Sequence, residues 1–190
     1  MSLDDLAARE EIRNLILRWC RAIDRLDFDA IREVFHPDAY DDHGSFKGGV
    51  EALIDWIRER HSGIPFSMHS VSNCLVDFLG ADEAVVESYC LALQKYPAAS
   101  RKKLEVLVGP LDIPSSPYLD MTVACRYVDL VSRREGVWRI EKRTVVLDSV
   151  SVLPGIELMN PDSAGWVTGK RGGEGRDRDH VYRMLSGNEE

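Results

Sequence analysis

Apolar residues recur at intervals of three and four through the first 25 positions of the chain. Ile12, Ile16, Trp19 and Ile23 fall on one face of a helix with 3.6 residues per turn, which predicts a long amphipathic helix from about residue 3 to residue 25. The segments "FDAIREVF" and "GVEALIDWIRER" have the same spacing and predict two shorter helices. The first of these should end before Pro37, because the residue before a proline avoids the helical region.

Beyond Pro65 the period of apolar residues changes to two, which indicates β-strands. Four strands are expected over about residues 67–79, 83–96, 121–132 and 137–148. Turn residues in "GADE" join the first pair, and "RREG" joins the last pair. The residues "AYDDHGSFKG" in addition predict a short strand and a turn ahead of the third helix.

Three helices followed by four long strands predict an α+β fold, in which the helices pack on one face of a curved antiparallel sheet. A sheet curled around a helix encloses a cone, whose open end is a natural small-molecule pocket. The uncovered face of such a sheet exposes apolar side chains, so we expect a homo-oligomer, either a dimer or a trimer. The expected contact surface is Val123, Cys125, Tyr127, Val131 and Val145.

Composition and charge exclude several classes of function. The 190 residues carry a net charge of -8, whereas a nucleic-acid-binding surface is basic. No apolar run approaches the roughly 20 residues of a membrane helix, and the acidic N-terminus lacks a secretory apolar core. We therefore expect a cytoplasmic protein without a nucleic-acid or membrane partner. The four cysteines occur singly, which favours reduced thiols over a disulfide or zinc framework.

Two segments do not fit a compact helix-and-strand pattern. Residues 97–120 form a long, proline-rich excursion between strands and contain the basic triplet "RKK". Such long excursions are usually functional or mobile. The tail is rich in glycine and mixed charge. We therefore expect one domain over residues 1–150 and a C-terminal extension over residues 151–190, partly disordered or docked on a neighbouring subunit.

An aspartate and a histidine lie at the edges of the predicted core. Asp24 falls at the margin of the apolar stripe of the first helix, and His69 lies near the start of the first long strand. Taken singly, a solvated aspartate and a histidine bonded to a backbone carbonyl are the commoner arrangements. Taken together, a carboxylate bonded to one imidazole nitrogen would fix the tautomer and make the other nitrogen a general base.

The segments "EEIRNLILRWCRAIDRLDFDAIREVF", "FSMHSVSN" and "RYVDLVSRREGVWRIEKRTVVLD" resemble the SnoaL-like branch of the NTF2-like superfamily. Scytalone dehydratase and hexachlorocyclohexane dehydrochlorinase are related to this branch. The resemblance covers about residues 8–148 and implies a cone-shaped α+β fold. It also implies that Asp24 and His69 form a catalytic dyad. The chain departs from the dehydrochlorinase at Trp19, where that enzyme has a lysine.

The remaining candidates for substrate contact come from strand positions and from this resemblance. They are Trp19, Tyr40, His43, Asn73, Tyr89 and Arg126. Tyr40 lies in the region where the dehydratase places a polarising tyrosine, and His43 is expected at the mouth of the cavity. Asn73 is expected on the same strand face as His69. Arg126 would need an anion or an acid partner if buried, and a salt bridge to a carboxylate is the equal alternative.

A metal site and a cofactor are not expected. Asp41, Asp42 and His43 are adjacent in "YDDHG", but neighbouring residues of a strand point to opposite faces and chelate poorly. The chain has no glycine-rich phosphate loop and no nucleophile motif.

Two functions remain open at this point. One is a cofactor-independent lyase or isomerase acting on a small, largely apolar molecule, with His69 as the base and Asp24 orienting it. The other is a non-catalytic binding or assembly subunit, like the small subunits of ring-hydroxylating dioxygenases.

Overall fold

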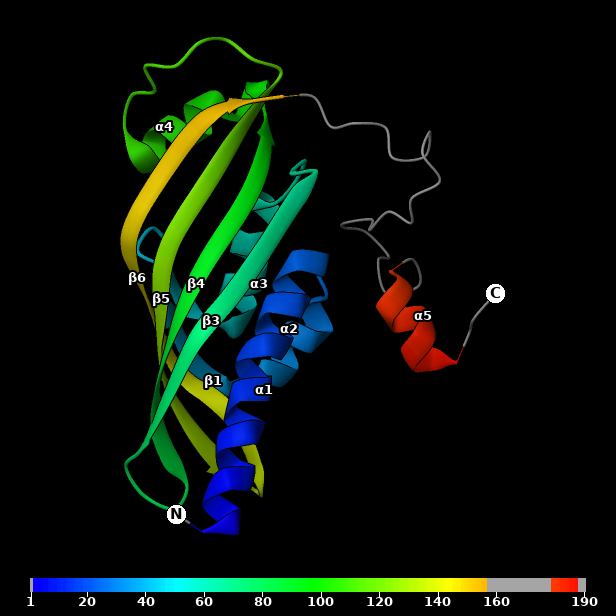
Figure 1. Cartoon of the computed structure of the whole chain (residues 1–190), viewed down its shortest axis with the longest axis vertical. Coiled ribbons are helices and arrows are strands. Elements are labelled where there is room, and N and C mark those ends of the chain that lie inside the picture. The colour runs from blue at the N-terminus through cyan, green and yellow to red at the C-terminus, as the bar shows by residue number, and fades with distance from the viewer. Residues whose placement is uncertain (1, 157–178, 188–190) are drawn as a thin grey trace.

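The computed structural model describes residues 2–156 and 179–187 (Figure 1). In chain order, its elements are α1 (Leu3–Arg25), α2 (Phe28–Val34), β1 (Phe35–Asp42), β2 (Lys47–Gly49), α3 (Val50–Arg60), β3 (Phe66–Phe78), β4 (Glu83–Pro97), a 3-10 turn (Ala98–Ser100), α4 (Arg101–Val108), β5 (Tyr118–Arg134), β6 (Val137–Gly155) and α5 (His180–Ser186). The α+β fold class is confirmed. The expected boundary at residue 150 falls inside β6, and most of the expected extension lies outside the described residues.

The six strands form one sheet in the order β2-β1-β6-β5-β4-β3. Strands β3 to β6 make the expected antiparallel meander, in which each strand pairs with the next along the chain. Strand β1 pairs in parallel with β6, so the sheet is mixed rather than wholly antiparallel as predicted. Figure 1 shows α1, α2 and α3 on one side of this strongly curved sheet.

Helix α1 is fixed at both ends and along its buried face. Ser2 and Asp5 form a capping box at its start, and Leu26 ends it in the left-handed conformation, with φ of 55°. Ile12 and Ile16 are fully buried against the sheet, and each contributes about 1.5–3 kcal/mol by leaving water. Trp19 and Ile23 are buried as well, so the end of α1, which carries Asp24, also packs against the core.

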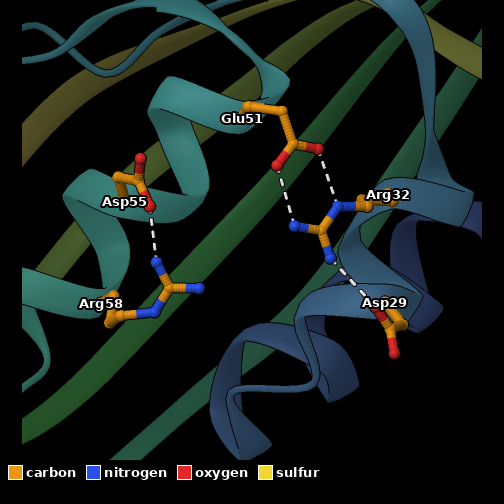
Figure 2. A network of polar contacts seen from close by, with 5 residues as sticks. All are labelled: Asp29, Arg32, Glu51, Asp55 and Arg58. Atoms are coloured by element: carbon orange, nitrogen blue, oxygen red, sulfur yellow. Dashed lines mark hydrogen bonds and ion pairs between the residues drawn. The ribbon is translucent and has the colours of Figure 1, made fainter.

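Helices α2 and α3 are joined by a polar network on their exposed sides, shown in Figure 2. The guanidinium of Arg32 donates to both carboxylate oxygens of Glu51, at 2.7 and 2.8 Å, and to Asp29 at 2.9 Å. On α3 itself, Arg58 pairs with Asp55 one turn away. The bidentate Arg32–Glu51 pair links α2 to α3 at the surface, while the buried faces of both helices supply the packing.

The excursion between β4 and β5 is ordered and contains α4, which lies at the upper end of the sheet in Figure 1. Leu104 anchors this helix in a small second core with Tyr96, Leu119 and Met121. The guanidinium of Arg101 donates to the carbonyl oxygens of Leu111 and Ile113, which ties the following loop to the helix. The segment is thus packed onto the end of the sheet.

The surface expected to join subunits was assigned to the wrong face of the sheet. Cys125, Tyr127 and Val131 are buried in the main core, and Val123 and Val145 pack against it. The outer face instead exposes apolar side chains of β3 and β4, namely Met68, Leu75, Tyr89 and Leu91. The apolar alternation along β5 marks Cys125, Tyr127 and Val131 correctly as one face, but that face is the buried one, and it also carries the buried Asp129.

Helix α5 lies against α1 of the same chain. Asp179 caps α5 and accepts a hydrogen bond from Arg25 at 3.1 Å, and the guanidinium of Arg21 lies 5.8 Å from the ring centre of Tyr182. None of the helices in residues 2–156 and 179–187 combines the length and the apolar character needed to cross a bilayer.

Candidate active site

A cavity of about 260 Å³ lies between the concave face of the sheet and the helices. Its walls come from α1, the turn after β1, α3, β3, β4, β5 and β6, and its rim includes Leu107 and Val108 of α4. Trp19, Trp56 and Tyr127 give it aromatic walls, so a flat apolar molecule would be in contact with side chains on several sides.

Asp24 and His69 meet at this cavity. Asp24 Oδ1 lies 2.7 Å from His69 Nδ1, and Asp24 Oδ2 accepts a hydrogen bond from the backbone N–H of His69 at 2.9 Å. The two side chains are 12% and 10% exposed. Because one carboxylate holds both the ring and the backbone of the same residue, the orientation of the imidazole is fixed from two sides.

The carboxylate also fixes which ring nitrogen carries the proton. Asp24 can only accept when ionised, so the neutral ring places its proton on Nδ1 and leaves the lone pair on Nε2. His69 lines the cavity, and the described residues provide no hydrogen-bond partner for Nε2. The arrangement can accept a proton at Nε2 and stabilise the resulting imidazolium through Asp24.

Ser67 adds a further support that was not identified from the sequence. Its hydroxyl donates to Asp24 Oδ1 at 3.3 Å, and the side-chain amide of Gln94 donates to Ser67 Oγ at 3.5 Å. The amide oxygen of Gln94 in turn accepts from the hydroxyl of Tyr96 at 2.8 Å. The only signal in the sequence is that Ser67 lies two residues before His69, and therefore on the same face of β3.

Of the six expected substrate contacts, Trp19 and His43 line the cavity and the other four do not. Tyr40 points outward from β1, between the inward-facing Ala39 and Asp41, and is 44% exposed. Asn73 also faces outward, because β3 has a register shift between Val71 and Cys74. The extra residue of this β-bulge puts Cys74, rather than Asn73, on the inner face.

Tyr89 and Arg126 were wrongly expected near the substrate. They are directly opposite each other on β4 and β5 and lie on the outer face of the sheet. Arg126 donates to Asp148 at 3.0 Å and to Glu87 at 2.8 Å, so it forms the salt bridge that was the alternative reading. Paired charges on the convex face cannot reach a molecule in the concave cavity.

His43 belongs to a second imidazole–carboxylate pair at the same cavity. Its Nδ1 is hydrogen-bonded to Oδ1 of Asp41, a carboxylate that is only 2% exposed. The ring centre of His43 lies 5.5 Å from that of Trp56 and 6.2 Å from that of Trp19. The sequence placed His43 at the cavity mouth but gave no sign of this pairing, which depends on Asp41 pointing inward.

A buried ion pair underlies this part of the cavity. Arg143 makes two hydrogen bonds of 2.7 Å to Asp129, and both side chains are fully buried. The guanidinium lies 4.3 Å from the ring centre of Tyr127 and 4.7 Å from that of Trp19. The pair therefore supports two aromatic walls of the cavity from behind. Within residues 2–156 and 179–187, no three His, Cys, Asp or Glu side chains are grouped to hold a metal ion.

The family of the chain is established by a match to the SnoaL-like domain over residues 4–144. The chain belongs to the SnoaL-like family. A further match is the uncharacterized protein Rv2910c of Mycobacterium tuberculosis, 30% identical over 76 residues, which are 38% of this chain and 52% of the relative. The matched region thus spans only about half the length of that relative.

Solved structures similar to this SnoaL-like protein agree with the fold. The hexachlorocyclohexane dehydrochlorinase LinA-type3 of Novosphingobium barchaimii has a TM-score of 0.66 at 21% identity, covering 84% of this chain and 99% of the enzyme. A scytalone dehydratase-like protein of Novosphingobium aromaticivorans has a TM-score of 0.64 at 19% identity, covering 80% and 91%. At these identities the likeness shows the cone-shaped NTF2-like fold.

Proposed function

We propose that this SnoaL-like protein is a cofactor-independent lyase or isomerase, dehydratase-like in its chemistry, that acts on a small, largely apolar molecule. The observation that carries the proposal is the Asp24–His69 pair, with Nε2 of His69 at an apolar cavity. His69 removes a proton from carbon, and Asp24 stabilises the imidazolium. A hydroxyl or similar group then leaves, or the proton returns at another position.

Two features of the cavity support proton removal rather than binding alone. The carboxylate of Asp24 accepts from three donors, namely the Ser67 hydroxyl, the backbone N–H of His69 and the His69 ring. A site that only binds an apolar molecule has no need of such a buried carboxylate, because a buried charge is costly to desolvate. The Asp24 and His69 side chains are also mostly buried, which strengthens the electrostatic interaction between the imidazolium and Asp24. The named activities of a dehydrochlorinase and a scytalone dehydratase-like protein among the structural neighbours are also eliminations.

The test uses 5-nitrobenzisoxazole, a flat aromatic compound that reports on a base without knowledge of the natural substrate. Removal of its C–H proton opens the ring to a coloured nitrophenolate. Wild-type protein should open it faster than free imidazole at the same concentration. His69→Ala should lower the rate by about 10²–10⁴-fold, the usual contribution of a positioned base. Asp24→Asn should also be severely impaired, because an amide cannot stabilise the imidazolium.

Two matched variants control for the loss of a histidine or an aspartate elsewhere. His180→Ala removes an exposed histidine on α5, and Asp77→Asn removes an exposed carboxylate on β3. Both should retain the wild-type rate. If the wild type gives no rate above free imidazole, or if His69→Ala retains full activity, the protein is a binding or assembly subunit, and the proposal is wrong.

We further propose that the protein self-associates as a dimer or a trimer. The helices α1, α2 and α3 cover the concave face of the sheet, whereas the apolar side chains of Met68, Leu75 and Leu91 on its outer face remain exposed. A second copy of the same surface would cover them and would place the Arg126 salt bridges beside the interface.

A further inference from the structure

The cavity holds two imidazole–carboxylate pairs, of which the proposed function uses one. His43 and Asp41 come from the end of β1, while His69 lies on β3 at the other edge of the sheet. Because the sheet curves around the cavity, both rings line the same space although four strand spacings separate β1 from β3 in the sheet. A bound molecule would therefore meet one imidazole from each side.

The charges behind His43 differ from those behind His69. In the sheet, Asp41 is directly opposite Arg143 of β6, and Arg143 is directly opposite Asp129 of β5. The three form a buried row, and the formal charges of this row amount to one excess negative charge. Oδ2 of Asp41 and Nη1 of Arg143 are both buried without a hydrogen-bond partner.

Protonation of His43 would balance this row. Uncompensated charge in a buried cluster is costly, and an imidazolium bonded to Asp41 removes the excess. With Nδ1–H directed to Asp41, the second N–H of the imidazolium is at Nε2. The His43 side chain is 18% exposed and the ring is flanked by Trp19 and Trp56, so this donor is available at the cavity. The other ionisable groups lining the same space are Arg60 and His61 at the end of α3, His69 on β3, and Cys125 and Tyr127 on β5.

We propose that His43 is the general acid of the elimination whose base is His69. This inference rests on the proposed function and assigns the second proton transfer of the same reaction. Nε2 of His69 takes the proton from carbon, and the C–H electron pair forms the new double bond. The bond from carbon to the leaving oxygen breaks, and the oxygen receives the proton from Nε2 of His43. His43 ends neutral and His69 ends charged, so one proton has crossed the cavity and the total charge is unchanged.

A structural role for the same pair predicts different behaviour. His43 also closes the turn after β1, with its backbone N–H donating to the carbonyl of Phe46 at 2.8 Å, so the Asp41 contact could serve only to fasten this turn. If the His43–Asp41 contact only held this turn in place, its loss would lower the stability of the protein and slow every reaction of the site by the same factor. Loss of a general acid slows a reaction most when the leaving oxygen is strongly basic, because such an oxygen leaves slowly unless it is protonated.

The experiment therefore uses a series of benzisoxazoles whose leaving phenols range from acidic (nitro-substituted) to weakly acidic (unsubstituted). Wild type and His43→Gln are compared on each compound, since glutamine can still donate to Asp41 but cannot deliver a proton readily. His43→Gln should lose about 10²-fold on the weakly acidic phenols, as expected of a general acid, and less than about threefold on the nitro compound. The dependence of rate on phenol acidity should steepen accordingly.

Asp41→Asn provides a second variant that keeps the hydrogen-bond acceptor and removes the charge behind His43. It should steepen the same dependence, and circular dichroism verifies that both variants are folded. If each variant loses the same factor in rate on every compound of the series, or loses no rate, His43 is not the general acid. His69 would still be the base in that case. A His69→Ala protein that keeps its rate would instead overturn the proposed function, and these two results are distinct.

Discussion

Removing one member of the Arg143–Asp129 pair should be among the most destabilising single changes in this protein. Asp129→Ala leaves a fully buried guanidinium without the carboxylate it is hydrogen-bonded to and deletes two hydrogen bonds of 2.7 Å. Breaking a buried pair in this way costs about 3–5 kcal/mol. A domain is typically stable by only about 5–15 kcal/mol, so the variant should approach the limit of folding.

The same magnitude can be expressed as a melting temperature. For 150–250 residues, each kcal/mol shifts the midpoint by about 2–4 °C, so Asp129→Ala should melt about 6–20 °C below the wild type. Burial raises the pKa of Asp129, and Arg143 offsets only part of that shift. Burial also opposes the charge on Arg143, but pairing with Asp129 raises its pKa, so the arginine is the fixed charge of the pair.

The assay is urea unfolding at one protein concentration, followed by tryptophan fluorescence, because the guanidinium lies 4.7 Å from the ring centre of Trp19. The double variant Asp129→Leu with Arg143→Met should recover most of the loss, since an apolar replacement of a buried pair is often neutral or stabilising. Asp38→Ala, which breaks an exposed pair with Arg134, is the control and should move the midpoint little. If Asp129→Ala lowers the free energy of unfolding by less than about 1 kcal/mol, the pair does not behave as a buried ion pair, and the reasoning is refuted.

Three further predictions concern other regions. Burial raises the pKa of Cys20 from 9.0 to about 12, so between these pH values the folded protein keeps a proton that the unfolded chain loses. The free energy of unfolding should therefore fall by about 1.4 kcal/mol per pH unit over this range. In alkaline urea titrations, Cys20→Ala should remove this decline. Ser67→Ala should slow 5-nitrobenzisoxazole opening by less than tenfold, because the two shorter bonds to Asp24 remain; a loss as large as that of His69→Ala would mean that Ser67 is essential. Leu91→Asp should convert the oligomer to a monomer in light scattering, whereas a wild type that is already monomeric at micromolar concentration would refute self-association through the outer face.

The sequence predicted the elements well where the apolar period was clear. Helix α1 has its predicted bounds, Leu3–Arg25, because an apolar face and a capping box both mark it. The meander followed from four strands of period two. The parallel pairing of β1 with β6 was missed, since a short strand carries no signal for the partner it will choose.

The candidate site was predictable only in part, for reasons that lie in the sheet. The contact between Asp24 and His69 was expected from the family resemblance alone. The two residues are far apart in the sequence, and their spacing does not indicate that their side chains meet. The bulge in β3 reversed the expected direction of Asn73. The apolar face of β5 was expected on the outside of the sheet, although Cys125, Tyr127 and Val131 are buried. Arg126 lies on the opposite face and was expected at the substrate, and the Arg143–Asp129 and Asp41–His43 pairs were not predicted.

The bulge in β3 has a consequence for the lengths that this strand tolerates. Val71 and Cys74 both face inward and pair with residues only two apart on β4, Cys90 and Ser88. One residue between them is therefore surplus to the pairing, and both Ser72 and Asn73 are exposed. Loss of Ser72 would leave His69 and the core residues beyond the bulge facing inward. Loss of a residue elsewhere in β3 would move the side chains on one side of the deletion to the opposite face of the sheet. Natural length variation in this strand should therefore concentrate at Ser72 and Asn73.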